Sequence, residues 1–117
     1  LNSMYVVVPR GHTTQSYTPT GTDGMMFTAR HGYVGFAVEQ QEFITEGLNE
    51  CGLSAGLFYF PHFGEYVPYN PDHKSRTISD FQLVSYILGE CATIDEVKAA
   101  VARIDIVNID PRSSTEH

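Results

Sequence analysis

Apolar residues along the chain gather in short runs that have the length of β-strands. The first run, Met4–Val8, is rich in β-branched residues and is closed by the turn residues Pro9-Arg10-Gly11. Further apolar runs cover Tyr33–Glu39, Phe43–Leu48 and Leu53–Phe60. The pattern therefore predicts strands through the first half of the chain.

Polar and turn-forming residues separate these runs. Residues 12–24 are rich in Thr, Ser, Gly and Pro, which predicts an exposed loop. The stretch Asn49-Glu50-Cys51-Gly52 includes residues that tolerate positive φ angles, so it predicts a β-hairpin turn. The run after this turn shows no alternation and contains the small residues Ala55 and Gly56, which predicts a strand covered on both faces.

A helix is predicted after an aperiodic, proline-containing loop at Pro61–Arg76. Ser79 and Gln82 have the spacing of a capping box, which starts a helix over about residues 80–89. One face of this helix consists of Phe81, Val84, Ile87 and Leu88. Gly89 is predicted to end the helix as its C-cap residue.

A second helix follows at once. Thr93 and Glu96 repeat the capping-box pattern and start a helix over about residues 94–103. Its apolar stripe consists of Val97, Ala100, Val101 and Ile104. Asp105–Ile109 then predicts a return to a strand. Several strands followed by a helical hairpin predict an α+β fold, as a single partial domain over residues 1–117.

The length, composition and net charge of the chain limit the classes of function. A chain of 117 residues with 42% hydrophobic residues is long enough to bury a core and is not a disordered segment. The net charge of −7 comes from 14 acidic and 7 basic residues, and the basic ones are scattered along the sequence. Because no cationic stripe exists, we expect neither nucleic acid nor a membrane as a partner.

The cysteines and histidines lack the spacings of metal or redox motifs. Cys51 and Cys91 form no CxxC pair, and the five histidines fall in no ligand pattern, so we expect no metal and no other cofactor. Two buried free thiols are favoured over a single disulfide bridge. A catalytic triad around Cys51 is the alternative to a small residue that fills a turn, and the turn interpretation is favoured.

Six aromatic residues lie within twelve positions, between residues 58 and 69. They are Phe58, Tyr59, Phe60, Phe63, Tyr66 and Tyr69. Prolines and a glycine break any helical period there, so the cluster is not one face of a helix. Two interpretations stay open. These residues either complete the core or form the wall of an apolar pocket with hydroxyl groups, suited to an aromatic or steroid-like acyl group.

Four motifs, in order along the chain, resemble those of the choloylglycine hydrolase and penicillin V acylase family. Val8-Pro9-Arg10-Gly11 is similar to the "PRG" strand end of that family, and Glu46–Leu53 resembles its "DGMNExGL" hairpin. Ala55–Pro61 resembles the "AGLxF(x)P" strand, and Cys91–Val97 is similar to the "NFxTVDEV" element of the second helix. The ordered set covers nearly the whole chain and is fairly specific.

This resemblance implies part of a four-layer αββα fold, that of the N-terminal-nucleophile hydrolases. In this family a free N-terminal cysteine is the nucleophile, and its own α-amino group accepts the proton, since such amines have pKa values near 8. The cysteine precedes the "PRG" strand, so we expect the nucleophile outside this segment. Leu1-Asn2-Ser3 runs directly into a strand, and residues 113–117 bring no terminating element, which likewise predicts a piece of a larger protein.

The resemblance also implies roles for residues of the aromatic cluster. Phe58 follows the "AGL" element and is expected to supply a backbone N–H to the oxyanion hole. Tyr59, Phe60, Phe63 and Tyr66 are the expected substrate-binding residues. Bile-salt hydrolases often carry asparagine at the position of Phe58. Acylase activity on other N-acyl amides, such as penicillin V, is therefore nearly as well supported as bile-salt hydrolysis.

The parent protein is thus expected to hydrolyse linear, non-peptide amides with a small-molecule N-acyl substrate, while this segment alone is inactive. The expected assembly is a homo-oligomer, either a dimer or a tetramer. The expected location is the cytoplasm, or the periplasm or exterior if a signal peptide was removed. The alternative is a non-catalytic module that binds a partner or dimerises through the aromatic loop 58–69.

Overall fold

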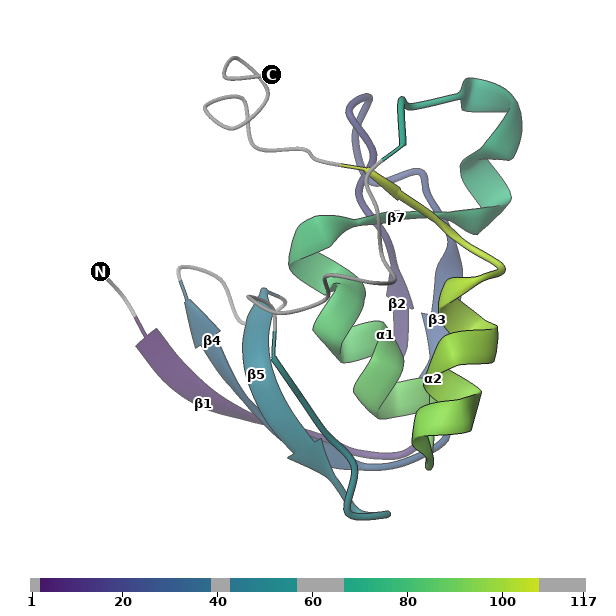
Figure 1. The fold of residues 1–117 in the computed structure, drawn as a ribbon. Coiled ribbons are helices and arrows are strands. Elements are labelled where there is room, and N and C mark those ends of the chain that lie inside the picture. The colour runs from purple at the N-terminus through teal and green to yellow at the C-terminus, as the bar shows by residue number, and fades with distance from the viewer. Residues whose placement is uncertain (1–2, 39–42, 57–66, 108–117) are drawn as a thin grey trace.

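A four-stranded antiparallel sheet is the largest sheet in the part of the chain that the structure describes. The structure, a computed structural model, describes residues 3–38, 43–56 and 67–107. The strands are β1 (Ser3–Val8), β4 (Tyr33–Val38), β5 (Ile44–Asn49) and β6 (Ser54–Gly56), in the order β1-β4-β5-β6 (Figure 1). The predicted strands of the first half are confirmed within the described residues, and so is the turn between β5 and β6, where Gly52 has a φ of 89°.

Helix α1 (Leu83–Glu90) lies across one face of the sheet, and α2 (Ile94–Val101) packs beside α1 (Figure 1). We call the face of the sheet toward α1 the inner face and the opposite one the outer face. Leu88 and Val84 of α1 pack with Ala37 and Ile44 of the sheet. Because α1 has neighbours on several sides, Leu83 through Gly89 are all buried, as expected of a helix with little polar surface.

Residues 12–24 were expected to form an exposed loop, and this prediction is wrong in part. Strand β2 (Thr13–Gln15) pairs with β3 (Met26–Thr28) in an antiparallel ribbon. Ser16 and Thr18 beyond β2 are buried, and the Ser16 N–H donates to the Met25 carbonyl over 2.8 Å. Polar residues here are buried because backbone and side-chain hydrogen bonds satisfy them, which an apolar pattern does not reveal.

Of the two strands in another short sheet, the sequence predicted only one. Strand β8 (Asp105–Val107) agrees with the predicted return to a strand, and it pairs in parallel with β7 (Thr77–Ser79). A parallel pair needs a long crossover, and α1 and α2 provide it. Strand β7 has only three residues, all buried. Its pairing depends on a partner that lies far along the chain.

The start of α1 differs from the predicted capping box. A 3-10 turn, η2 (Asp80–Gln82), precedes α1. Gln82 is 1% exposed, and its Oε1 accepts hydrogen bonds from the Ser16 hydroxyl, the Tyr17 N–H and the Ser79 hydroxyl over 2.7–2.9 Å. The glutamine therefore ties the helix start to the loop after β2 instead of capping its own helix.

The predicted C-cap role of Gly89 is also wrong, because α1 continues to Glu90. A Cβ at Gly89 would lie 3.2 Å from the Cα of Ala29, so the glycine permits close approach of the helix to that segment. The second cap is confirmed: the Thr93 hydroxyl accepts from the Glu96 N–H over 3.2 Å. The Glu96 carboxylate reaches the N–H of Ala92 over 2.8 Å.

The predicted loop Pro61–Arg76 ends in regular structure. Its last six residues form a 3-10 helix, η1 (Pro71–Arg76), which the side chain of Asn70 caps. Asp105 of β8 binds this helix through Arg76, with an Nε–Oδ1 distance of 3.3 Å, and through His73. Lys74 pairs with Asp23 over 3.1 Å. The α+β fold class is confirmed, with an antiparallel main sheet and a helical hairpin.

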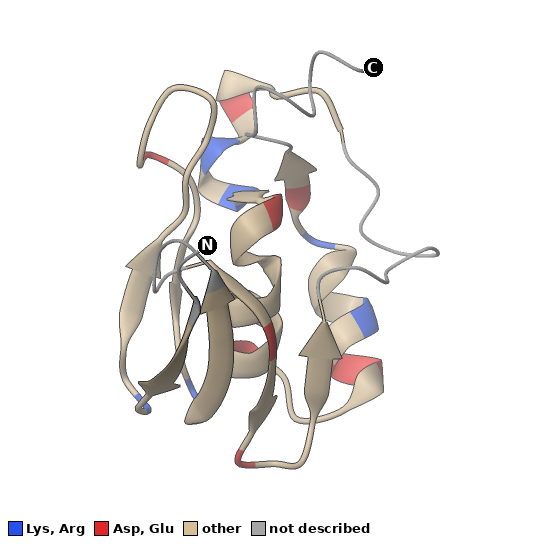
Figure 2. Ribbon diagram, turned by 90° about the vertical axis from the view of Figure 1, so that its left-hand side faces the viewer, with Lys and Arg blue, Asp and Glu red and all other residues tan. Residues whose placement is uncertain are grey.

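The basic residues of the described chain are spread over η1, α2 and the turns (Figure 2). Three of them, Arg10, Lys74 and Arg76, are in ion pairs with carboxylates. In the described parts of the chain, every helix is too short or too polar to cross a membrane.

Candidate functional site

The residues predicted to act on substrate follow strand β6. Phe58, Tyr59, Phe60, Phe63 and Tyr66 all lie outside the described residues, so their roles stay predictions. Gly56 is the last residue of the described segment 43–56, and it pairs with Glu46 at the end of β6 away from the hairpin turn. Phe58 follows Gly56 by two positions in the sequence.

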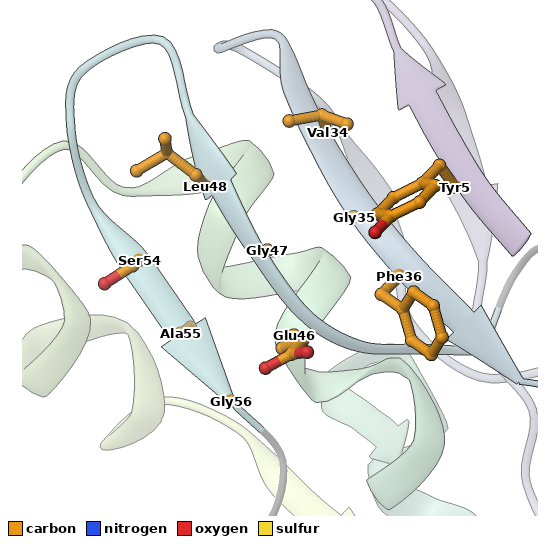
Figure 3. Close-up of a pocket in the computed structure, with 10 residues that line it drawn as sticks. All are labelled: Tyr5, Val34, Gly35, Phe36, Glu46, Gly47, Leu48, Ser54, Ala55 and Gly56. Carbon is orange, nitrogen blue, oxygen red and sulfur yellow. The ribbon is translucent and has the colours of Figure 1, made fainter.

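A shallow groove of about 520 Å³ crosses the outer face of the sheet beside β6 (Figure 3). All four strands of the main sheet contribute to its lining, and Glu46 is the one charged residue among the described residues that line it. The lining residues are Tyr5, Val34, Gly35, Phe36, Glu46, Gly47, Leu48, Ser54, Ala55 and Gly56.

The outer face is largely apolar but open. Tyr5 and Val7 are 81% and 77% exposed, and Leu48 is 48% exposed. Tyr5 contacts Phe36 edge to face, with ring centroids 5.5 Å apart. Ser54 of β6 is exposed on this face, so in the described residues the run after the turn is not covered on both faces as predicted. An apolar surface of this kind suits packing against another layer or binding of an apolar group.

A pair of glycines sets the floor of the groove. Gly35 and Gly47 are direct partners across β4 and β5. A Cβ at Gly47 would lie 2.7 Å from Cδ1 of Leu88 and 2.5 Å from the Val34 carbonyl oxygen. Gly47 thus lets α1 approach the inner face closely, whereas Gly35 makes room for the side chain of Ile44 in β5.

Two motif residues meet at the other end of the sheet. Arg10 of the "PRG" turn donates from Nε to the Glu50 carboxylate over 2.6 and 3.0 Å, and its NH2 group contacts the same carboxylate. Glu50 also accepts from the Gly32 N–H over 3.0 Å. The hydrogen bond between them raises the pKa of Arg10 and lowers the pKa of Glu50. These residues connect the turn after β1 to the β5–β6 turn.

Asn49 fixes the same turn from the inside. Its side chain is buried, and Nδ2 donates to the carbonyls of Leu88 and Cys91 over 2.9 and 2.6 Å. Its Oδ1 accepts from the N–H groups of Cys51 and Leu53, both over 3.0 Å. One asparagine therefore satisfies the C-terminal end of α1 and the hairpin turn together.

The two cysteines differ in their surroundings. Both are free thiols as predicted, but only Cys91 is buried, so the predicted burial of Cys51 is wrong. Sγ of Cys51 lies 3.4 Å from Nδ1 of His31. Burial raises the pKa of Cys91 to about 11. Of the described residues, none form a group of three or more acidic, histidine or cysteine side chains able to hold a metal ion.

The sequence contained signals for some of these contacts but not for all. Arg10, Asn49 and Glu50 belong to the motifs that carry the family resemblance, yet the motifs alone do not say which residues pair. His31 stands in no motif, and 20 positions separate it from Cys51. Only the fold brings these two side chains together.

Comparison with solved structures shows what fold this is. Over 92% of the chain and 32% of the other protein, the structure matches penicillin V acylase from Agrobacterium tumefaciens, with a TM-score of 0.68 and 24% identity. A mutant of conjugated bile acid hydrolase from Clostridium perfringens matches over 91% of the chain and 31% of that protein, with a TM-score of 0.67 and 20% identity. The fold is that of the N-terminal-nucleophile hydrolases.

The sequence comparison narrows the fold to a family. Residues 1–116 match the family described as linear amide C-N hydrolases, choloylglycine hydrolase family. The chain belongs to this family. A bile salt hydrolase/transferase from Lactiplantibacillus plantarum is 29% identical over 73 residues, which cover 62% of the chain and 22% of that protein. The chain thus spans about a fifth to a third of the length of these relatives.

Proposed function

We propose that the protein to which this chain belongs hydrolyses a linear amide, with an N-terminal cysteine as nucleophile. The observation that carries the proposal is the family match over residues 1–116. The thiol would attack the amide carbonyl while the α-amino group of the same cysteine accepts the proton, because an amine with a pKa near 8 titrates close to neutrality. Neither group depends on a metal or another cofactor.

In this proposal the chain contributes an oxyanion-hole donor. The backbone N–H of Phe58 would bind the oxyanion of the tetrahedral intermediate. Strand β6, which leads to Phe58, is held by β5 through the register from Leu48–Ser54 to Glu46–Gly56. We propose that the pairing of β6 helps to fix this donor, because preorganised donors stabilise developing charge without a reorganisation cost.

The segment that follows β6 in the sequence would supply the acyl-binding wall. Tyr59, Phe60, Phe63 and Tyr66 are proposed to contact the N-acyl group, as aromatic side chains offer apolar area with hydroxyl groups at the rim. The groove on the outer face supports this proposal, because it is largely apolar and Gly56 is among its lining residues. Bile salts and penicillin V are both candidate substrates, since each joins a large apolar acyl group to an amide.

Substitution of Phe58 tests the oxyanion-hole role. Phe58→Pro deletes the backbone N–H, and we expect kcat of the full-length protein on its amide substrate to fall about 10²–10³-fold. Phe58→Ala and Phe58→Asn keep the N–H and should retain kcat within a few-fold. Equal kcat values for the proline and alanine variants, both folded by circular dichroism, would rule out this donor.

The segment itself is proposed to be inactive. Residues 1–117 contain two cysteines, at positions 51 and 91, and neither is at the N-terminus. We expect purified 1–117 to release no amine from glycine-conjugated bile acids, taurine-conjugated bile acids or penicillin V. Turnover by this segment would mean that another nucleophile acts.

A further inference from the structure

We propose that Cys51 and His31 form a thiol site that reacts with low-molecular-weight disulfides, giving a mixed disulfide at Cys51. The site lies at the β5–β6 turn, whereas the residues proposed for amide hydrolysis follow the opposite end of β6. The inference does not rest on the proposed function.

The first argument is access combined with a proton acceptor. Cys51 is exposed, and its Sγ lies 3.4 Å from Nδ1 of His31, which is hydrogen-bond distance for sulfur. A thiol is a weak nucleophile and its thiolate a strong one, so an imidazole that takes the proton activates the sulfur.

The second argument is that both partners are held in place by the same helix end. Asn49 accepts from the Cys51 N–H and donates to two carbonyls at the end of α1. The His31 N–H donates to the Gly89 carbonyl of α1 over 3.1 Å. Because both backbones are tied to one rigid element, the contact does not depend on two independent loops.

Among the described residues, the charged side chains of Arg10 and Glu50 lie near the pair. Arg10 and Glu50 bind each other, so the carboxylate next to Cys51 in sequence is largely neutralised.

Cys91 serves as an internal control for the reactivity of Cys51. It is 1% exposed, and burial raises its pKa to about 11, so the folded protein should protect it from the same reagent. The site has two groups that could bind a metal, the Cys51 thiol and the His31 imidazole. The described residues contain no group of three such side chains. Covalent thiol chemistry is therefore favoured over metal binding at this site.

The reaction is a thiol–disulfide exchange. His31 accepts the proton of Cys51, and the sulfur attacks one sulfur of the disulfide. A new S–S bond forms as the S–S bond of the reagent breaks, and the second sulfur leaves as a thiolate that takes a proton from the imidazolium or from water. Cys51 is oxidised, and the reagent is reduced to one thiol.

The experiment measures the rate of this exchange at each cysteine of the full-length protein. 2-Hydroxyethyl disulfide is a suitable reagent, because its charge does not change with pH. Trypsin places Cys51 in peptide 31–74 and Cys91 in peptide 77–98, so mass spectrometry follows the two sites separately. We expect Cys51 to be modified in the folded protein and Cys91 only after unfolding in guanidinium.

The variant that tests the pair is His31→Gln, with His12→Gln as the matched control at an exposed histidine. Near pH 7 we expect His31→Gln to slow modification of Cys51 roughly tenfold, less than a buried general base contributes, because water competes at an exposed pair. The difference should vanish above about pH 9.5, where thiols ionise unaided. Protection of Cys91 shows that the variant is folded.

Two results would overturn the proposal. One is a His31→Gln protein that reacts at the wild-type rate across this pH range. The other is a Cys51 that stays unmodified in the folded wild-type protein but reacts after unfolding. Loss or retention of amide hydrolysis bears on neither result, so the two proposals fail independently.

Discussion

Asn49 offers the sharpest test of how the hairpin turn is built. Its side chain is 4% exposed and makes four hydrogen bonds, to the carbonyls of Leu88 and Cys91 and from the N–H groups of Cys51 and Leu53. Asn49→Ala removes all four. Three of the four backbone partners belong to buried residues, so water does not readily replace the lost contacts.

The expected cost is large for one substitution. A neutral hydrogen bond contributes about 1 kcal/mol net, and a buried group left without a partner costs about 1–3 kcal/mol. Four bonds, one of them at the exposed Cys51 where water substitutes, give a loss of about 3–5 kcal/mol in the free energy of unfolding. That is a substantial part of the ~5–15 kcal/mol that stabilises a typical domain.

The matched control is Asn70→Ala. Asn70 is exposed, and its side chain makes a single capping bond, from the Asp72 N–H over 3.0 Å. We expect a cost of about 0.5–1 kcal/mol, as for other N-cap residues. Urea unfolding followed by circular dichroism compares the two variants. Hydrogen exchange should accelerate at the amides of Cys51 and Leu53 in Asn49→Ala. Equal stability losses in the two variants would refute the reasoning.

Three further predictions concern other parts of the fold. Gly47→Ala should lower the free energy of unfolding by about 2–3 kcal/mol in urea unfolding, because its methyl carbon would lie 2.5 Å from a carbonyl oxygen of β4. Gly52→Ala has open space around it but a φ of 89°, so it should lower the free energy of unfolding by about 1–2 kcal/mol in the same assay. Hydrogen bonds, first from the Thr18 hydroxyl, lower the pKa of Asp23 to about 2. Because this pKa is below the unfolded value, the stabilisation by Asp23 should be present above about pH 4 and lost toward pH 2; carbon-13 NMR titration should show the low pKa, and Thr18→Val should raise it. Gln82→Leu keeps the size but removes an acceptor of three bonds, so the free energy of unfolding should fall by about 2–4 kcal/mol, and an unchanged value would contradict the assigned contacts.

Local patterns predicted the elements whose causes are local. Strands β1, β4 and β5 are apolar runs between turn residues, and the β5–β6 turn has Gly52 where a positive φ is needed. The cap of α2 is confirmed because Thr93 binds a residue only three positions away. In each case the interacting groups lie within one element.

The predictions from sequence were wrong where a residue could interact either within its own element or with a distant segment, and the structure shows the distant interaction. Gln82 fits a capping box, but its side chain binds Ser16 and Tyr17, 66 and 65 positions away. Gly89 fits a C-cap, but its role is close packing against Ala29. The ribbon β2–β3 and strand β7 are too short and polar to show a period of their own.

The candidate site was predicted from ordered motifs and not from chemistry visible in the segment. The motif residues Arg10, Asn49 and Glu50 prove to be structural, since they hold the two turns at one end of the sheet. The residues expected to touch substrate, led by Phe58, lie outside the described residues. The pairing of His31 with Cys51 could not be predicted from the sequence, because it depends on the packing of both segments against α1.

The most direct test of the central claim is amine release by the full-length protein. The substrates are glycine- and taurine-conjugated bile acids and penicillin V, and the comparison is with a variant in which alanine replaces the N-terminal cysteine. We predict turnover of at least one substrate by the wild-type protein and none by the variant. Absence of turnover on all of them, or undiminished turnover by the alanine variant, would contradict the assignment of a cysteine-dependent amide hydrolase.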